Sequence, residues 1–166
     1  YNDGTASNAG HVRVYEYSGS SWTQLGADID GEAASDSSGS SVSLSSDGTK
    51  VAIGASYNDG TASNAGHVRV YEYSGSSWTK LGDDIDGEAS VDFSGWSVSL
   101  SSDGTIVAIG ARYNDANGSD SGHVRVYKNI SGTWTQLGAD IDGEAIGDNS
   151  GYSVSLSSDG TIVAIG

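Results

Sequence analysis

An acidic segment that recurs along the chain offers the most conspicuous candidate chemistry. It reads Asp28-Ile-Asp-Gly-Glu-Ala in its first copy, with Asp36 shortly after it, and it returns at 84–92 and 140–148. Alternating carboxylates are typical of calcium loops, but the first ligand position is glycine, Gly26 in the first copy and Gly138 in the third, and the extra carboxylate of the second copy, Asp83, is out of register. We therefore favour carboxylates that solvate a loop and cap its backbone amides, with weak calcium binding as the alternative. No cofactor and no tight metal site is predicted.

The histidines are a second candidate set. His11, His67 and His123 are the only ones, each within Gly-His-Val-Arg and 56 residues from the next. A metal site needs converging ligands, and one histidine per repeat does not supply a histidine cluster. A structural hydrogen-bonding role is therefore the favoured interpretation.

The many serines do not indicate a catalytic nucleophile. Such a serine needs a partner base and acid, and the sequence has no Gly-x-Ser-x-Gly elbow between a strand and a helix. The sequence therefore predicts that the protein is not an enzyme.

The elements that would position these residues repeat with the same period. Ser41–Gly54 consists of two alternating apolar runs joined by Asp-Gly, and it returns at 97–110 and 153–166. Asp-Gly favours a tight turn because both residues tolerate positive φ. Each of these segments is predicted to be a β-hairpin.

The whole chain, 1–166, is predicted to be one segment built from the repeats 1–56, 57–112 and 113–166. Within a repeat, His11–Tyr17 and Trp22–Ile29 form a second hairpin, with a bulge expected at Gly26. Four short strands and no helical periodicity predict an all-β fold, a β-propeller of four-stranded antiparallel blades. A parallel β-helix is the rival, but its turns are shorter than this repeat.

The order of the strands bears on how such a ring closes. The chain begins with the third and fourth strands of one blade and ends with the first two of another. Three blades are too few for a ring. We expect either self-association, with two chains giving six blades, or completion by further repeats of a longer chain.

Three motifs in each repeat resemble the FG-GAP repeats of the integrin α-subunit propeller. They are Gly151-Tyr-Ser-Val-Ser-Leu156, Val107-Ala-Ile-Gly-Ala111 and Gly122-His-Val-Arg-Val-Tyr127. The family's proline after Gly-Ala is absent, and Ser45–Thr49 is too short to be its Asp-x-Asp-x-Asp-Gly calcium loop. The resemblance implies an extracellular or cell-surface protein concerned with adhesion or ligand binding.

Differences between the repeats indicate either a ligand-binding patch or drift at tolerant loop positions, and the two interpretations have equal weight. Copies one and two differ at only eight positions, and the copies vary mainly in the long loop before each opening hairpin. The strand order places this loop and the one between strands two and three on the same face of the ring. The candidate ligand-binding residues on this face are Phe93, Trp96, Tyr152, Asp36, Asp92 and Asp148.

Composition excludes some partners. A net charge of −15 with only seven Lys and Arg residues argues against nucleic acid, and no apolar stretch is long enough for a membrane span. Asn117-Gly-Ser and Asn129-Ile-Ser are candidate glycosylation sites. The predicted function is a non-catalytic extracellular recognition or adhesion module with a protein or glycan ligand. The alternatives are a structural scaffold that assembles into a ring or filament and a calcium-dependent binding module.

Overall fold

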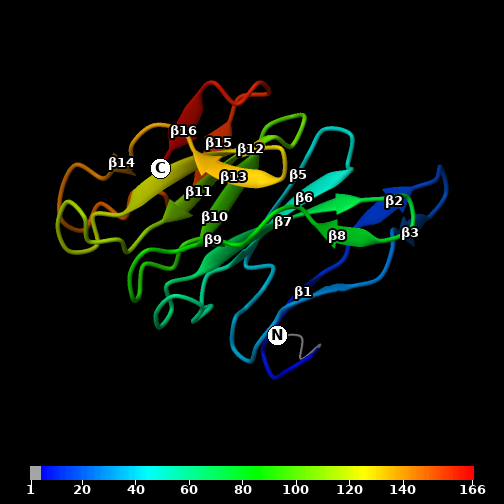
Figure 1. Ribbon diagram of the computed structural model, residues 1–166, viewed down its shortest axis with the longest axis horizontal. Coiled ribbons are helices and arrows are strands. Elements are labelled where there is room, and N and C mark those ends of the chain that lie inside the picture. Colours follow the sequence, from blue (N-terminus) through cyan, green and yellow to red (C-terminus); the bar gives the residue numbers. More distant parts are fainter. Residues whose placement is uncertain (1–4) are drawn as a thin grey trace.

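The computed structural model describes residues 5–166, and within that range the chain is all β, with antiparallel strand pairs and no helix (Figure 1). The first complete sheet contains β5 (Ser41–Leu44), β6 (Lys50–Ala55), β7 (His67–Tyr73), β8 (Trp78–Lys80) and β9 (Ile85–Asp86). The second contains β10 (Ser97–Leu100), β11 (Ile106–Ala111), β12 (His123–Ile130), β13 (Thr133–Gln136) and β14 (Ile141–Asp142). Antiparallel strands in repeated sheets confirm the predicted all-β class.

Partial sheets precede and follow these two. At the start, β1 (His11–Val12) pairs with β4 (Ile29–Asp30), and β2 (Tyr15–Tyr17) pairs with β3 (Trp22–Gln24); we call these two pairs together the first partial sheet. The last partial sheet is made of β15 (Val154–Leu156) and β16 (Val163–Ile165). The opening loop of the first repeat, 1–4, lies outside the described residues. The interruption expected near Gly26 is seen in every repeat: in the second, β8 and β9 both pair with β7, and Gly82 between them has a φ of +79°.

The loop of the opening hairpin differs from the predicted tight turn. It spans 45–49, and only Gly48 has a positive φ, whereas Asp47 does not. The Asp47 carboxylate instead accepts hydrogen bonds from the Thr49 backbone N–H and from the hydroxyls of Ser45 and Thr49. These bonds, the Thr49 N–H first, lower the pKa of Asp47 to about 2. The backbone turn bond from the Gly48 N–H to the Ser45 carbonyl is present as well, so the Asp47 side chain adds a charged cap to a loop longer than a two-residue turn.

Neighbouring sheets pack a large face against a small one, as the alternation of side chains predicts. Ala52 of β6, on the small face, lies in one buried cluster with Val107 and Ile109 of the next sheet. Behind it, Val51 and Ile53 pack against Val12, Val14 and Ile29 of the first partial sheet. The core is therefore a series of layers between sheets that follow one another in chain order (Figure 1).

The first strands of successive hairpins, β5, β10 and β15, are also joined by hydrogen bonds. The backbone N–H of Leu100 donates to Ser43 Oγ at 2.9 Å, and that of Leu156 donates to Ser99 Oγ at 3.0 Å. Small side chains on β5, β10 and β15 bring these strands close enough for each to bond the next.

One layer is left uncovered at the start of the series. Val42 and Leu44 are 54% and 49% exposed, whereas their repeat equivalents Val98 and Leu100 are 9% and 7% exposed. The difference arises because β5 and β6 cover the second pair, and no described hairpin covers the first.

The two kinds of long loop lie together, as the strand order predicts. Gly66 in the loop after β6 forms a parallel bridge with Ser94 in the loop before β10, and Gly122 and Ser150 repeat this contact. This gathers on one side the loops in which the repeats differ. In residues 5–166 no helix is long and apolar enough to cross a membrane.

Candidate functional site

The aromatic side chains that distinguish the second and third repeats gather into one cluster on the long-loop side. We define the aromatic–arginine cluster as Tyr57, Phe93, Trp96, Arg112, Tyr113 and Tyr152. Its members follow β6 and β11 or precede β10 and β15, so four loops contribute. Three of them, Phe93, Trp96 and Arg112, occupy positions where the first repeat has serine.

Edge-to-face contacts join Phe93 to two tyrosines of the cluster. The Phe93 ring lies 5.0 Å from that of Tyr57 and 5.5 Å from that of Tyr113, both at an interplanar angle of 73°. Such pairs contribute about 0.5–1.5 kcal/mol beyond the area they bury. Phe93 itself has a φ of +54°, an uncommon value for a bulky residue, so the loop places this ring at a backbone cost.

The other half is built around the guanidinium of Arg112. Its Cζ lies 3.5 Å from the ring centroid of Trp96, 4.1 Å from that of Tyr113 and 5.3 Å from that of Tyr152. Its Nε is buried without a hydrogen-bond partner among the described residues. The cation is therefore held mainly by aromatic faces, and Tyr152 remains exposed beside it.

A cavity of about 460 Å³ adjoins the cluster, a size typical of ligand pockets. Tyr57 and Trp96 line it together with Ser40 and Ser56, which stand where the second repeat has Trp96 and Arg112. The small side chains of the first repeat thus leave space beside the large ones of the second. The far side of the cavity is formed by Gly10 and His11, next to the unpaired edge of β1.

Phe93, Trp96 and Tyr152 were predicted from the sequence, and the structure brings all three into the cluster. Tyr57, Arg112 and Tyr113 were not predicted. Arg112 carried a signal, because position 56/112 is one of the eight that differ between the first two repeats. The two tyrosines carried none, since every repeat begins with tyrosine.

Two of the acidic candidates are corrected by the structure. Asp36 and Asp92 are each only 3% exposed. Asn58 donates to the Asp36 carboxylate at 2.9 Å, and Asn114 donates to that of Asp92 at 3.0 Å. Both carboxylates therefore clamp one long loop to the next and are not available to a ligand. Asp148 is exposed and accepts only the nearby Ala145 N–H among the bonds described, so its role stays a prediction.

The recurring acidic segment is bound by arginines of its own chain. Arg13 pairs with Asp28, and its hydrogen bond lowers the pKa of that carboxyl to about 2. Burial acts to raise the pKa of Asp84, but hydrogen bonds from Arg69 and Lys80 outweigh it and lower the value to about 2. These two carboxylates thus already have cationic partners.

The glycosylation candidates differ in accessibility. Asn117 is exposed, and its amide donates to the carbonyl of Gly143 at 2.8 Å. The amide nitrogen of Asn129, the atom that a glycan would modify, is buried within β12. Asn129 is therefore corrected as a site in the folded chain, whereas Asn117 stays a prediction.

Comparison with known proteins supports the resemblance and the fold. Residues 84–127 match the family described as FG-GAP repeat, which confirms the likeness for that part of the chain. No curated protein matches the chain. The structure is similar to the crystal structure of a Bacteroides fragilis protein provisionally named a 6-phosphogluconolactonase, with a TM-score of 0.58 and 13% sequence identity. The alignment covers 97% of this chain and 37% of that one, so the chain spans little more than a third of that protein's length.

This likeness corrects the prediction that the protein is not an enzyme. A protein of similar fold bears the name of a hydrolase, so the lack of a nucleophile elbow does not exclude catalysis in this architecture. At 13% identity the likeness concerns the fold, and no reaction or residue is carried over from it.

Proposed function

We propose that this chain is a recognition module that binds a protein or glycan ligand at the aromatic–arginine cluster and the cavity beside it. One observation carries the proposal. Among repeats that are otherwise nearly identical, the substituted positions 93, 96 and 112 converge on a single partly exposed cluster. Loop positions vary freely, but drift alone does not require the new side chains to contact one another. Trp, Tyr and Arg are also the residues that most often dominate binding energy at interfaces.

Loss of the Trp96 indole is expected to abolish most of the binding. Trp96 lies between Arg112 and the cavity, so Trp96→Ala removes a cavity wall and the closest aromatic face on the guanidinium. We expect affinity for a ligand found on a protein and glycan array to fall about 30-fold, the size of a 2 kcal/mol interface contribution. Phe93→Ala should weaken binding in the same direction.

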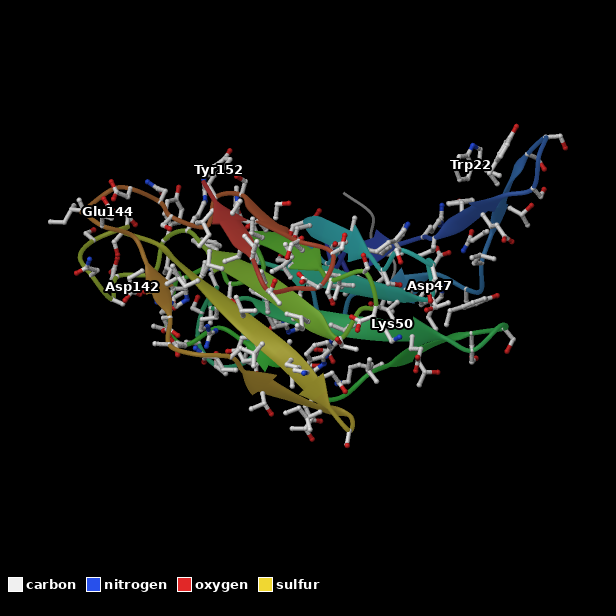
Figure 2. All side chains as sticks on the ribbon, turned by 90° about the horizontal axis from the view of Figure 1, so that it is seen from above. Trp22, Asp47, Lys50, Asp142, Glu144 and Tyr152 are labelled. Atoms are coloured by element: carbon white, nitrogen blue, oxygen red, sulfur yellow. The ribbon has the colours of Figure 1, made fainter. Side chains whose placement is uncertain are left out.

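The matched control for this experiment is Trp22→Ala. Trp22 is also exposed, and Figure 2 shows it far from Tyr152, at the other side of the molecule. Its replacement should leave affinity unchanged. An array without reproducible ligands would favour the scaffold alternative, and equal losses in Trp96→Ala and Trp22→Ala would contradict a site at the cluster.

The β-propeller arrangement of the sheets is also a proposal. We infer that the repeated sheets are blades of a β-propeller whose ring is completed by further strands, either from a second copy or from further repeats. The support is complementarity: Val42 and Leu44 on a large face are exposed, and so are Ser155 and Ala164 on the small face of the last hairpin. In the interior, Ser43 and Ala52 of one sheet cover Val98 and Leu100 of the next.

Light scattering on the 166-residue chain tests the second-copy form of this proposal. A mass twice that of the chain is expected, because burying the exposed faces would favour pairing of two copies. Val42→Asp should restore the single-chain mass, since a carboxylate would enter the covered layer. Ile146→Asp, at a fully accessible loop position, is the control and should leave the dimer intact. A folded monomer at high concentration would contradict self-association and favour further repeats.

We also propose an extracellular or cell-surface location and an adhesive role. Their support is the FG-GAP match, which agrees with the resemblance to integrin propeller repeats.

A further inference from the structure

The imidazole of His123 has a buried nitrogen without a hydrogen-bond partner in the described part of the chain. The His123 side chain is only 1% exposed. Its Nδ1 lies 3.7 Å from Asp140 Oδ2 and 4.0 Å from Asp142 Oδ1, and both distances are too long for a hydrogen bond. A third carboxylate, that of Glu88, comes from the preceding sheet's loop. A buried polar atom is thus aimed into an acidic group that it does not bond.

The equivalent place in the second repeat is occupied by the protein's own cations. There Arg69 binds both oxygens of Asp84, through Nε at 3.0 Å and Nη2 at 2.7 Å. Lys80 adds its Nζ at 2.7 Å, and Arg69 also pairs with Glu32 from the preceding repeat. The two carboxylates grouped with His67, those of Glu32 and Asp84, therefore already have a cationic partner.

Two features around Asp140 differ from those around Asp84 in the second repeat: the residue four positions before the aspartate and the orientation of the arginine. Gln136 stands where the second repeat has Lys80, and its neutral amide donates to Asp140 Oδ1 at 2.6 Å. Arg125 is turned away from Asp140: its Nη2 donates to the carbonyl of Asp86 at 2.8 Å, and its Nη1 lies 3.2 Å from Glu88. Within residues 5–166, Asp140 Oδ2 therefore faces His123 without a lysine or arginine partner.

The charge around His123 also favours a bound cation. Three carboxylates face one guanidinium, so the group carries excess negative charge beside a buried nitrogen. A bound cation would offset this excess negative charge.

We propose that Glu88, His123 and Asp140 bind one divalent transition-metal ion of the zinc class. Their ligand atoms lie within 4.8 Å of one another. In tetrahedral geometry, zinc bonds of about 2.0–2.2 Å place two ligand atoms about 3.4 Å apart, close to the distance of 3.7 Å between His123 Nδ1 and Asp140 Oδ2. Glu88 must approach by on the order of 1 Å, which its half-exposed side chain can do by giving up its pairing with Arg125. Nitrogen as one of the ligands favours zinc over calcium, and three protein ligands leave a position for water or for Asp142.

Isothermal titration of the purified, metal-free chain with ZnCl2 tests this site. One zinc ion per chain is expected. Asp140→Asn keeps the shape of the side chain but removes the charge, and it should weaken zinc binding at least about tenfold. His123→Asn should do the same if it folds, and Asp140→Asn keeps the test decisive if it does not. Calcium should not compete with zinc at equal concentration.

The matched control is Asp84→Asn, which makes the same change at the equivalent position of the second repeat. Its zinc affinity should equal that of the unaltered chain. Absence of zinc binding would overturn the proposal. Equal weakening by Asp84→Asn and Asp140→Asn would also overturn it, because that result indicates diffuse attraction to an acidic surface. Undiminished binding in a folded His123→Asn chain would do so too.

Discussion

Replacing Ile109 by alanine is expected to lower the free energy of unfolding by about 2–5 kcal/mol. Ile109 is 1% exposed and lies in the layer between the two complete sheets, in one cluster with Ala52, Val68 and Val98. Removing three of its carbon atoms loses their transfer free energy and leaves a cavity, because strands held on both sides cannot collapse into it. Urea unfolding followed by circular dichroism measures the loss.

Ile146→Ala is the matched control for this prediction. The same atoms are removed, but Ile146 is 74% exposed. Its effect should lie within about 0.5 kcal/mol of zero. Similar losses in both variants would show that the layer between the sheets is not the main source of stability.

Gly110→Ala is expected to have the second large effect on stability. A Cβ built on Gly110 would lie 2.1 Å from the backbone oxygen of Gly151 and 2.5 Å from Ser97 Oγ. Ser97 Oγ itself donates to that same oxygen at 2.7 Å. The methyl group must therefore separate the second sheet from the last hairpin, which costs about 1–3 kcal/mol of overpacking and about 1 kcal/mol for the hydrogen bond.

The equivalent glycine of the third repeat provides the control. In the described chain, the one atom within 4 Å of a Cβ on Gly166 is Ser153 Oγ, at 3.0 Å, and the end of a side chain can move aside. Made in the Val42→Asp variant, in which no second copy is expected to cover the last hairpin, Gly166→Ala should therefore leave the urea midpoint nearly unchanged. A loss as large as that of Gly110→Ala would mean that intrinsic strand effects, and not contact between sheets, account for it.

The strand pattern was predictable because it depends on local alternation. Val51 and Ile53 on one side and Ala52 on the other belong to a single strand, and their contacts with the neighbouring sheets follow from that parity. The turn at Asp47 was less predictable, because a side chain competing for the backbone amide of Thr49 depends on loop length as well as residue type.

The candidate site was predictable only in part. Variation between the repeats indicated Phe93 and Trp96, since a comparison of copies needs no coordinates. The acidic character of the same loops also indicated Asp36 and Asp92, which are unchanged between the repeats and which the structure shows to be buried clamps. Sequence comparison finds the loop that varies, but burial of one member depends on the loop of the next repeat.

The sequence by itself determined the repeat, the all-β class, the size difference between the two faces of each strand and the acidic character of the loops. These are properties of residue order within one unit. Only the tertiary structure decided what each repeated residue contacts. Arg69 and Arg125 occupy the same position in identical motifs, yet Arg69 binds Asp84 of its own repeat as well as Glu32 of the preceding one, whereas Arg125 turns to Asp86 and Glu88 of the preceding repeat. The physical reason is that these side chains lie between sheets, so identical motifs meet different neighbours from one interface to the next.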